Sequence, residues 1–204
     1  MPITINGSGT IAGISAGGLP DGSVVAADLA SSLDLTGKTV TLPSGTGGKI
    51  LQVQSTTKTD TFSAVLSSET DITGMSVNIT PSSTSSKVLV MVTMSFAVTT
   101  AHVSTGIYLY RDSTKIYIGD ASDSNHRVSY SPTESYSFTY SPGNASMTHL
   151  DSPATTSQVT YKLAADDVYS TDTTFRLNRG NDASATTNLY AVTASSITAI
   201  EVAG

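Results

Sequence analysis

Apolar and polar positions alternate most regularly along residues 87–98, KVLVMVTMSFAV. Neighbouring side chains of a strand point to opposite faces, and the β-branched run disfavours a helix. The opposite row is apolar only at its start, at Leu89 and Met91. The pattern predicts the central strand of a sandwich, with one face in the core and the other partly against another surface, such as a second copy of the chain. The core face is apolar at six successive positions: Val88, Val90, Val92, Met94, Phe96 and Val98.

Shorter alternating runs recur through the chain after residue 49, separated by polar loops. They predict strands around residues 50–53, 62–65, 72–80, 136–140, 159–163, 174–177 and 196–202, and a hairpin over residues 106–119. Abundant Thr favours strands, and abundant Ser favours the turns between them. About eight or nine strands at this spacing predict an all-β fold, a jelly-roll β-sandwich.

Residues 1–48 have a different composition from the rest of the chain, because isolated aliphatic residues alternate there with glycine and small residues. Such a segment cannot close a core alone and would pack on copies of itself or on a partner. We expect an extended Gly-rich arm, with one short helix at residues 23–33 and one strand at 35–43. The chain therefore divides into an arm, 1–48, and a head domain, 49–204. The candidate docking residues of the arm are Ile3, Ile5, Ile11, Ile14 and Leu19.

Charge and composition exclude several classes of function. The net charge is -6, with ten Lys and Arg residues in 204, and a nucleic-acid binder normally presents a basic face. The chain has no cysteine, so disulfides and thiolate chemistry are excluded. The opening residues lack the features of a signal peptide, and no apolar run is long enough for a membrane span. We expect neither nucleic-acid binding nor membrane insertion.

Several segments resemble those of tail-fibre and appendage proteins of marine and cyanobacterial phages. They are GGKILQV (47–53), STTKTDTF (55–62), ITPSSTSSKVLV (79–90), LDSPATT (150–156), VTYK (159–162) and SSITAIEV (195–202). TINGSGTI (4–11) and GLPDGS (18–23) are similar to the attachment segments of the same group. The resemblance implies a homotrimer with a jelly-roll head of the tumour-necrosis-factor or C1q kind. The arm would fix it to another virion protein, and the chain, made in the host cytoplasm, would be located in the virion.

Three other functions are alternatives to this role, and the sequence fits the first of them best. A capsid head fibre or decoration protein fits the short chain, which has no repetitive shaft. A glycan depolymerase tailspike would need a repeated β-helix and paired carboxylates, which the sequence does not show. A free bacterial lectin has no use for a glycine-rich, aliphatic leader. We therefore expect a virion structural protein that binds host surface polysaccharide and is not an enzyme.

Titratable residues offer only weak candidates for chemistry. His102, His126 and His149 lie far apart, without neighbours at ligand spacing, although one His near a three-fold axis would meet its two copies. The acids at 120–125 and at 166–167 supply only part of a calcium site and fit solvated turns. We expect no cofactor and no metal.

Tyrosines are the candidate residues for glycan binding or for subunit contact. Aromatic faces stack on sugars, and the hydroxyl also donates a hydrogen bond. Alternation places three of them on one side of the predicted hairpin, and three flank the polar loop that follows. The six are Tyr108, Tyr110, Tyr117, Tyr130, Tyr136 and Tyr140.

Overall fold

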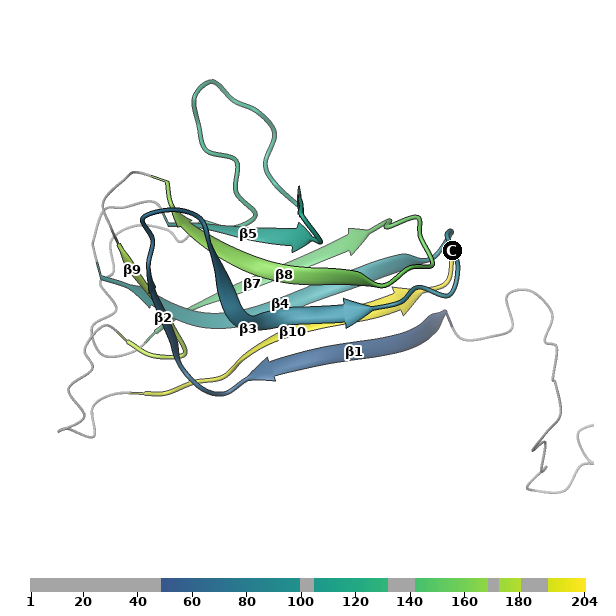
Figure 1. The fold of residues 1–204 in the computed structure, drawn as a ribbon, viewed down its shortest axis with the longest axis horizontal. Coiled ribbons are helices and arrows are strands. Elements are labelled where there is room, and N and C mark those ends of the chain that lie inside the picture. Colours follow the sequence, from purple (N-terminus) through teal and green to yellow (C-terminus); the bar gives the residue numbers. More distant parts are fainter. Residues whose placement is uncertain (1–48, 100–104, 132–141, 169–172, 181–190) are drawn as a thin grey trace, which may run out of the picture. The chain divides into compact units, whose positions relative to one another are not determined.

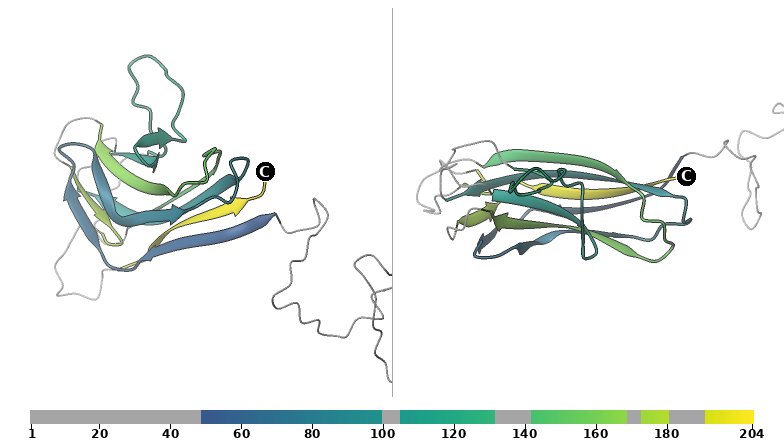
Figure 2. Two further views of the ribbon diagram at one scale, coloured as in Figure 1. Left: turned by 45° about the vertical axis from the view of Figure 1, so that its right-hand side comes forward. Right: turned by 90° about the horizontal axis from the view of Figure 1, so that it is seen from above.

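A computed structural model describes residues 49–99, 105–131, 142–168, 173–180 and 191–204. These residues form two antiparallel sheets and no helix, which confirms the predicted all-β class (Figures 1 and 2). The strands are β1 (Ile50–Lys58), β2 (Phe62–Val65), β3 (Thr70–Ile79), β4 (Lys87–Val98), β5 (Thr105–Arg111), β6 (Thr114–Ile116), β7 (Gly143–Asp151), β8 (Val159–Asp167), β9 (Thr174–Leu177) and β10 (Ser195–Val202).

The larger sheet, called sheet A, is built around β4. β7 pairs with one edge of β4, and β10 and β9 pair in turn with the other edge. β1 lies beside β10, and β2 lies beside β9. Because β9 and β10 follow one another along the same edge of β4, they act as one strand interrupted at residues 178–194.

The second sheet, called sheet B, has the order β3-β8-β5-β6. β5 and β6 form a hairpin whose turn includes Asp112 at a φ of 53°. This confirms the predicted hairpin only as far as Ile116. Tyr117 then takes a φ of 53°, and the chain leaves the sheet. Residues 117–130, called the finger loop, stand away from the sandwich before Tyr130 pairs with Ile107 (Figure 1).

The core lies between the two sheets, and the inward row of β4 fills its centre. All six predicted core residues of β4 are buried, as are their neighbours Met75, Val77 and Ile79 on β3. The Phe96 and Phe175 rings stack with their centroids 5.4 Å apart. Burying each large apolar side chain contributes about 1.5–3 kcal/mol, so this row alone provides a large part of the folding free energy.

A buried asparagine closes the sheet where β9 is interrupted. Asn178 has a φ of 62° and no exposed surface. Its side-chain amide donates to the backbone oxygens of Lys58, at 2.8 Å, and Asp60, at 2.9 Å. Its amide oxygen accepts a hydrogen bond from the Ser195 hydroxyl at 2.6 Å. The side chain of Asn178 therefore joins the ends of β9, β10 and β1, while its backbone N–H donates to the Ser95 carbonyl of β4 at 2.8 Å.

A buried carboxylate at the other end of β10 holds the connection between β3 and β4. Glu201 is fully buried and accepts hydrogen bonds from the backbone N–H and the hydroxyl of Ser82, both at 2.7 Å, and from Gln52 at 2.6 Å. Burial opposes ionisation, but the hydrogen bonds outweigh it and lower the pKa of Glu201 to about 2. The ionised carboxylate is therefore the form that the fold stabilises.

A third polar cluster links the two sheets. The Arg111 guanidinium of β5 lies 2.9 Å from both carboxylate oxygens of Asp151 on β7. Tyr161 of β8 donates its hydroxyl to the same carboxylate at 2.8 Å. Burial, and then this hydrogen bond, raise the pKa of Tyr161. Because Asp151 is buried, the Arg111 cation offsets its charge, and the Tyr161 hydroxyl supplies a further hydrogen bond.

The predicted strands agree unevenly with the structure. Residues 87–98 and 174–177 are strands with the expected limits, whereas the strand beginning at residue 159 runs on to Asp167. β7 was not predicted. The expected strand at 136–140, the helix at 23–33 and the strand at 35–43 lie outside the described residues.

Replacing Asn178 should destabilise the fold strongly. Asn178→Ala removes three side-chain hydrogen bonds and replaces Asn, which tolerates a positive φ, by Ala, which tolerates it less well, so we expect a loss of about 2–4 kcal/mol in urea unfolding. Asn178→Gly keeps the backbone conformation and should lose less. Asn125→Ala, in the finger loop, is the matched control and should stay within about 0.5 kcal/mol of wild type. Equal stability of Asn178→Ala and this control would contradict the assigned role.

Glu201 should make stability depend on acid pH. Its folded pKa lies below its usual value of 4.5, so its contribution is complete above about pH 4.5 and is lost as the pH falls toward 2. Glu201→Gln should cost about 1–3 kcal/mol at neutral pH and flatten the fall in unfolding free energy between pH 4.5 and 2. The control, Asp123→Asn in the finger loop, should leave that fall unchanged. An unchanged acid profile in Glu201→Gln would show that another group causes it.

Candidate functional site

The outer face of sheet B carries a network of tyrosine, lysine and carboxylate side chains. Lys115 of β6 lies with its Nζ 3.7 Å from the centroid of the Tyr108 ring and 2.5 Å from a carboxylate oxygen of Glu69. Tyr110 donates its hydroxyl to the same carboxylate. Lys162 pairs with Asp71 at 2.6 Å and lies 5.4 Å from the Tyr110 ring centroid. We call these six side chains the tyrosine–lysine network.

The network covers its own aromatic rings. Tyr108 is 4% exposed, because Lys115 lies over its ring. Burial, and then the nearby charges of Asp166 and Glu69, raise the pKa of Tyr108. Burial, and then the hydrogen bond to Glu69, raise the pKa of Tyr110. In this arrangement Tyr108 has no free ring face for a sugar, and both phenols stay neutral in the physiological range.

The other predicted tyrosines lie apart from this network. Tyr117 is 45% exposed and its ring centroid is 5.2 Å from that of His149 on β7. Tyr130 is half-buried and meets Phe96 edge to face at 6.4 Å between centroids. Tyr136 and Tyr140 lie outside the described residues. The structure thus brings Tyr108 and Tyr110 together on one face and places Tyr117 and Tyr130 elsewhere.

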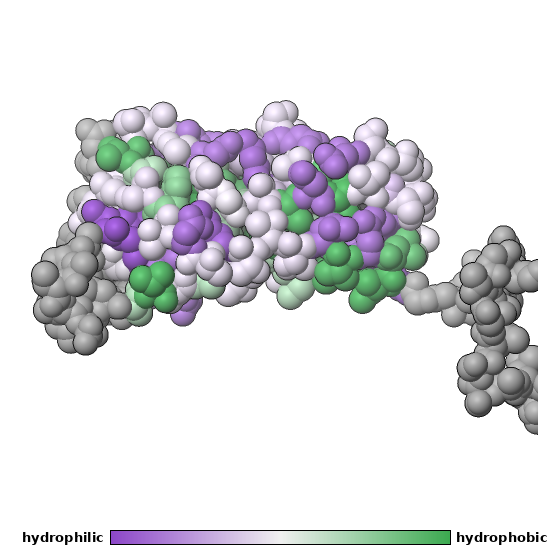
Figure 3. All heavy atoms as spheres, turned by 60° about the horizontal axis from the view of Figure 1, so that its bottom comes forward, coloured by the Kyte–Doolittle hydropathy of each residue, from purple (hydrophilic) through white to green (hydrophobic). Residues whose placement is uncertain are grey.

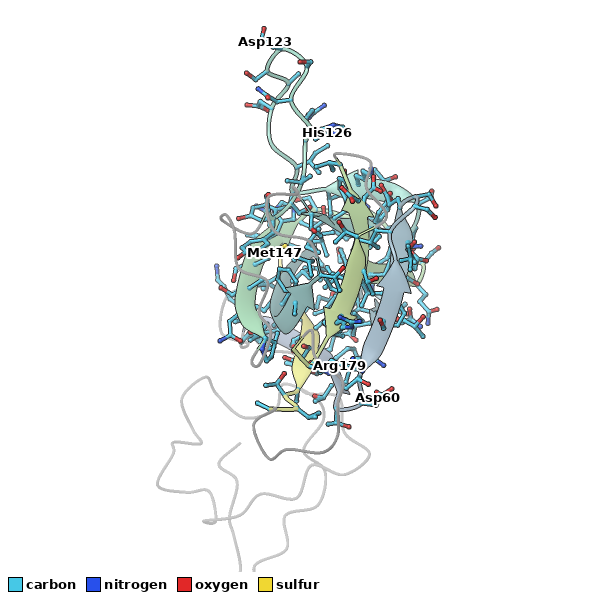
Figure 4. The ribbon with its side chains drawn as sticks, turned by 90° about the vertical axis from the view of Figure 1, so that its left-hand side faces the viewer. Asp60, Asp123, His126, Met147 and Arg179 are labelled. Atoms are coloured by element: carbon cyan, nitrogen blue, oxygen red, sulfur yellow. The ribbon has the colours of Figure 1, made fainter. Side chains whose placement is uncertain are left out.

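The finger loop presents mainly polar side chains. Asp123 lies at its tip and His126 on its side, pointing away from the sandwich (Figure 4). Its two arms are held by a hydrogen bond from Arg127 Nε to the Gly119 carbonyl at 2.6 Å. The loop is an exposed projection with hydrogen-bonding groups, and it offers contact surface rather than a cleft.

The described residues contain no cluster of three or more His, Asp and Glu side chains that could hold a metal ion. His126 and His149 lie in the finger loop and on β7, and His102 lies outside the described residues. Asp167 is buried at the end of β8, and its carboxylate accepts the backbone N–H of Thr173 at 3.3 Å. Asp167 therefore stabilises the fold at the end of β8 and does not lie in a solvated turn.

The outer face of sheet A differs from that of sheet B, because it carries neither an aromatic nor a charged network. One row crosses four strands through successive paired residues: Val53, Ile200, Leu89 and Leu150. We call it the aliphatic row. Val53 is 54% exposed and Leu150 48% exposed in the single chain. In Figure 3, hydrophobic side chains gather on this side of the domain near the start of β1.

Two further rows continue the outer face of sheet A. The next row is Ser55, Thr198, Met91 and Thr148, and the row after it is Thr57, Ser196, Thr93 and Ser146. Ser55 and Thr198 share a hydrogen bond of 2.8 Å. The face therefore changes from aliphatic at one end to hydroxyl-bearing at the other, without a charge in any of the three rows.

The sequence pattern indicated this surface only in part. The opposite row of residues 87–98 pointed to Leu89 and Met91, but nothing local connects them to Val53, Ile200 or Leu150. The candidate docking residues Ile3, Ile5, Ile11, Ile14 and Leu19 lie outside the described residues.

Comparison of the sequence with protein-family models and with curated proteins finds no match. Within the described residues, no helix is long and apolar enough to cross a membrane. The geometry of the sandwich and its surfaces is therefore the basis for assigning a function.

Lys115 should contribute more to stability than Lys162. Lys115→Ala removes the cation from the Tyr108 ring and the ion pair with Glu69, so we expect a loss of about 1–2 kcal/mol in urea unfolding. Lys162→Ala, the matched control on the same face, loses a more distant ring contact and a pair with the exposed Asp71. It should cost less than about 0.5–1 kcal/mol. Equal losses would contradict the cation–π contact as a stabilising feature.

Proposed function

We propose that this chain is a structural protein of a bacteriophage virion, a homotrimeric fibre or appendage without enzymatic activity. It attaches to another virion protein through residues 1–48 and presents its β-sandwich to a host surface polysaccharide. The head domain is a jelly roll, and no cofactor or metal is needed for its role. The resemblance of its segments to phage appendage proteins supports this proposal.

The observation that carries the proposal is the strand order. Without the short strands β2 and β9, sheet A has the order β1-β10-β4-β7 and sheet B has the order β3-β8-β5-β6. When the eight remaining strands are counted along the chain, sheet A contains the first, eighth, third and sixth, in that order. Sheet B contains the second, seventh, fourth and fifth. This order is the one expected of a jelly roll, an architecture that recurs in viral structural domains and in lectins, and it supports the proposal.

The two ends of the sandwich differ in a way that suits an appendage. Ile50, where residues 1–48 join the domain, pairs with Val202. The connections at that end are residues 80–86, 112–113 and 152–158. At the opposite end β4 and β8 end, and β5, β7 and β9 begin. Loops on a rigid scaffold commonly carry binding residues, so we assign host contact to the finger loop, which stands away from the sandwich on the side of sheet B (Figure 1).

A trimeric head suits weak glycan recognition. Three identical sites on one rigid body raise the effective concentration of the second and third contacts, so a low affinity per site is sufficient. Of the described tyrosines, Tyr117 offers the most exposed ring for such contacts. The polar groups of the finger loop could provide hydrogen bonds to sugar hydroxyls beside it.

Antibodies raised against the full chain should label purified particles of the phage that encodes it. Immunogold on the tail indicates a tail appendage, and gold over the capsid indicates a head fibre or decoration. The same particles should contain the chain by mass spectrometry. Presence of the chain in the lysate but not in gradient-purified particles would contradict a virion role.

The non-enzymatic role is tested on host envelope polysaccharide. The full chain should cosediment with the polysaccharide, more weakly after Tyr117→Ala than after the control Tyr110→Phe, and should release no reducing ends. Release of oligosaccharides would contradict the proposal and favour a depolymerase.

A further inference from the structure

We infer that the outer face of sheet A is the surface through which copies of this chain contact one another. This inference rests on the homotrimer proposed above and names the interface that such an assembly would use. The surface consists of the aliphatic row and the two rows that follow it on β1, β10, β4 and β7.

The aliphatic row is too apolar for a surface that stays in water. Its four large side chains lie next to one another across the sheet, with Ile50 and Val202 paired at the adjoining edge. Ile50 is 63% exposed in the single chain. Scattered apolar side chains are normal on a protein surface, whereas a contiguous group of this kind marks an interaction site. Covering it would remove these side chains from water.

The chemistry of the face selects a copy of the same chain as the partner. The chain carries a net charge of -6, so its copies repel one another except where they meet without charge. The three rows contain no charged residue, and Lys87 lies beyond them, paired with Val202 at the end of β4. The charged side chains of the tyrosine–lysine network lie on the other sheet.

The hydroxyl-bearing rows also suit contact between identical surfaces. Ser and Thr hydroxyls both donate and accept hydrogen bonds. A hydroxyl on one copy can therefore pair with a hydroxyl on another, and the two surfaces need not carry separate donors and acceptors. A charged partner would instead call for opposite charges on this face. A lipid surface would call for an aromatic and basic border; Lys87 is the basic residue beside the aliphatic row, and the three rows contain no Trp, Tyr, Lys or Arg.

The test changes residues that are already exposed in the single chain, so that its fold is kept. In the full chain, Val53→Asp and Leu150→Asp together place two charges at opposite ends of the aliphatic row. The matched control is Ser76→Asp with Asn78→Asp, two exposed positions on β3 in sheet B. Light scattering after gel filtration measures the mass, and circular dichroism checks the β content.

We expect wild type and the control to have three chain masses, and the Val53→Asp, Leu150→Asp variant to have one, with the same β content. A variant that keeps three chain masses would overturn the inference and leave the homotrimer standing. A wild-type chain that stays at one chain mass at every concentration would overturn both. A wild-type dimer that these substitutions dissociate would support the interface and contradict the trimer.

Cross-linking provides a second measurement that does not depend on dissociation. Because the chain has no cysteine, Met91→Cys introduces a single thiol at the centre of the face. A short bis-maleimide should join Met91→Cys chains to one another, and it should leave Ser76→Cys chains unjoined. If residues 1–48 of the same chain cover the face instead, Met91→Cys chains will not cross-link, which overturns the inference.

Discussion

The structure depends on burying one face of β4 while both edges of that strand are hydrogen-bonded. The strand contributes six core side chains and pairs with β7 on one edge and with β10 and β9 on the other. A strand in this position cannot shift its register, because a one-residue slip would turn Val88 and Phe96 out of the core. The pairing of β4 therefore fixes which residues of its neighbours face outward, including the aliphatic row.

Much of the fold could be predicted where a strand has one clear apolar face. β4 and β9 were found at their observed limits, and β3 by the alternation of Met75, Val77 and Ile79. β7 escaped prediction because it is an edge strand whose outward side chains are polar except for Leu150 and whose inward ones include only Ala145 and Met147 as buried apolar residues. Its pairing with β4 is a tertiary effect that overrides weak local preference.

The candidate surfaces could be predicted less well, because they depend on register between distant segments. Alternation alone placed Tyr108 and Tyr110 on one face, but not Lys115 over the Tyr108 ring or Tyr117 beside His149. The aliphatic row joins four strands whose partners lie far apart in sequence. Asn178 is similar, since an isolated asparagine in a Ser- and Thr-rich chain gives no local sign that it holds a sheet together.

The interruption between β9 and β10 has a consequence for how such a domain can vary. Arg179 pairs with Val192 at the base of the excursion, and Asn178 and Ser195 bond to each other across it. The pairing with β4 resumes at Ser196. Doubling the length of a closed loop costs only about 0.6 kcal/mol, so the number of residues between Arg179 and Val192 should have little effect on the stability of the sheet. Foreign peptides inserted between Arg179 and Val192 should thus leave the pairing of β9 and β10 with β4 unchanged, and natural diversification could proceed there without refolding the domain.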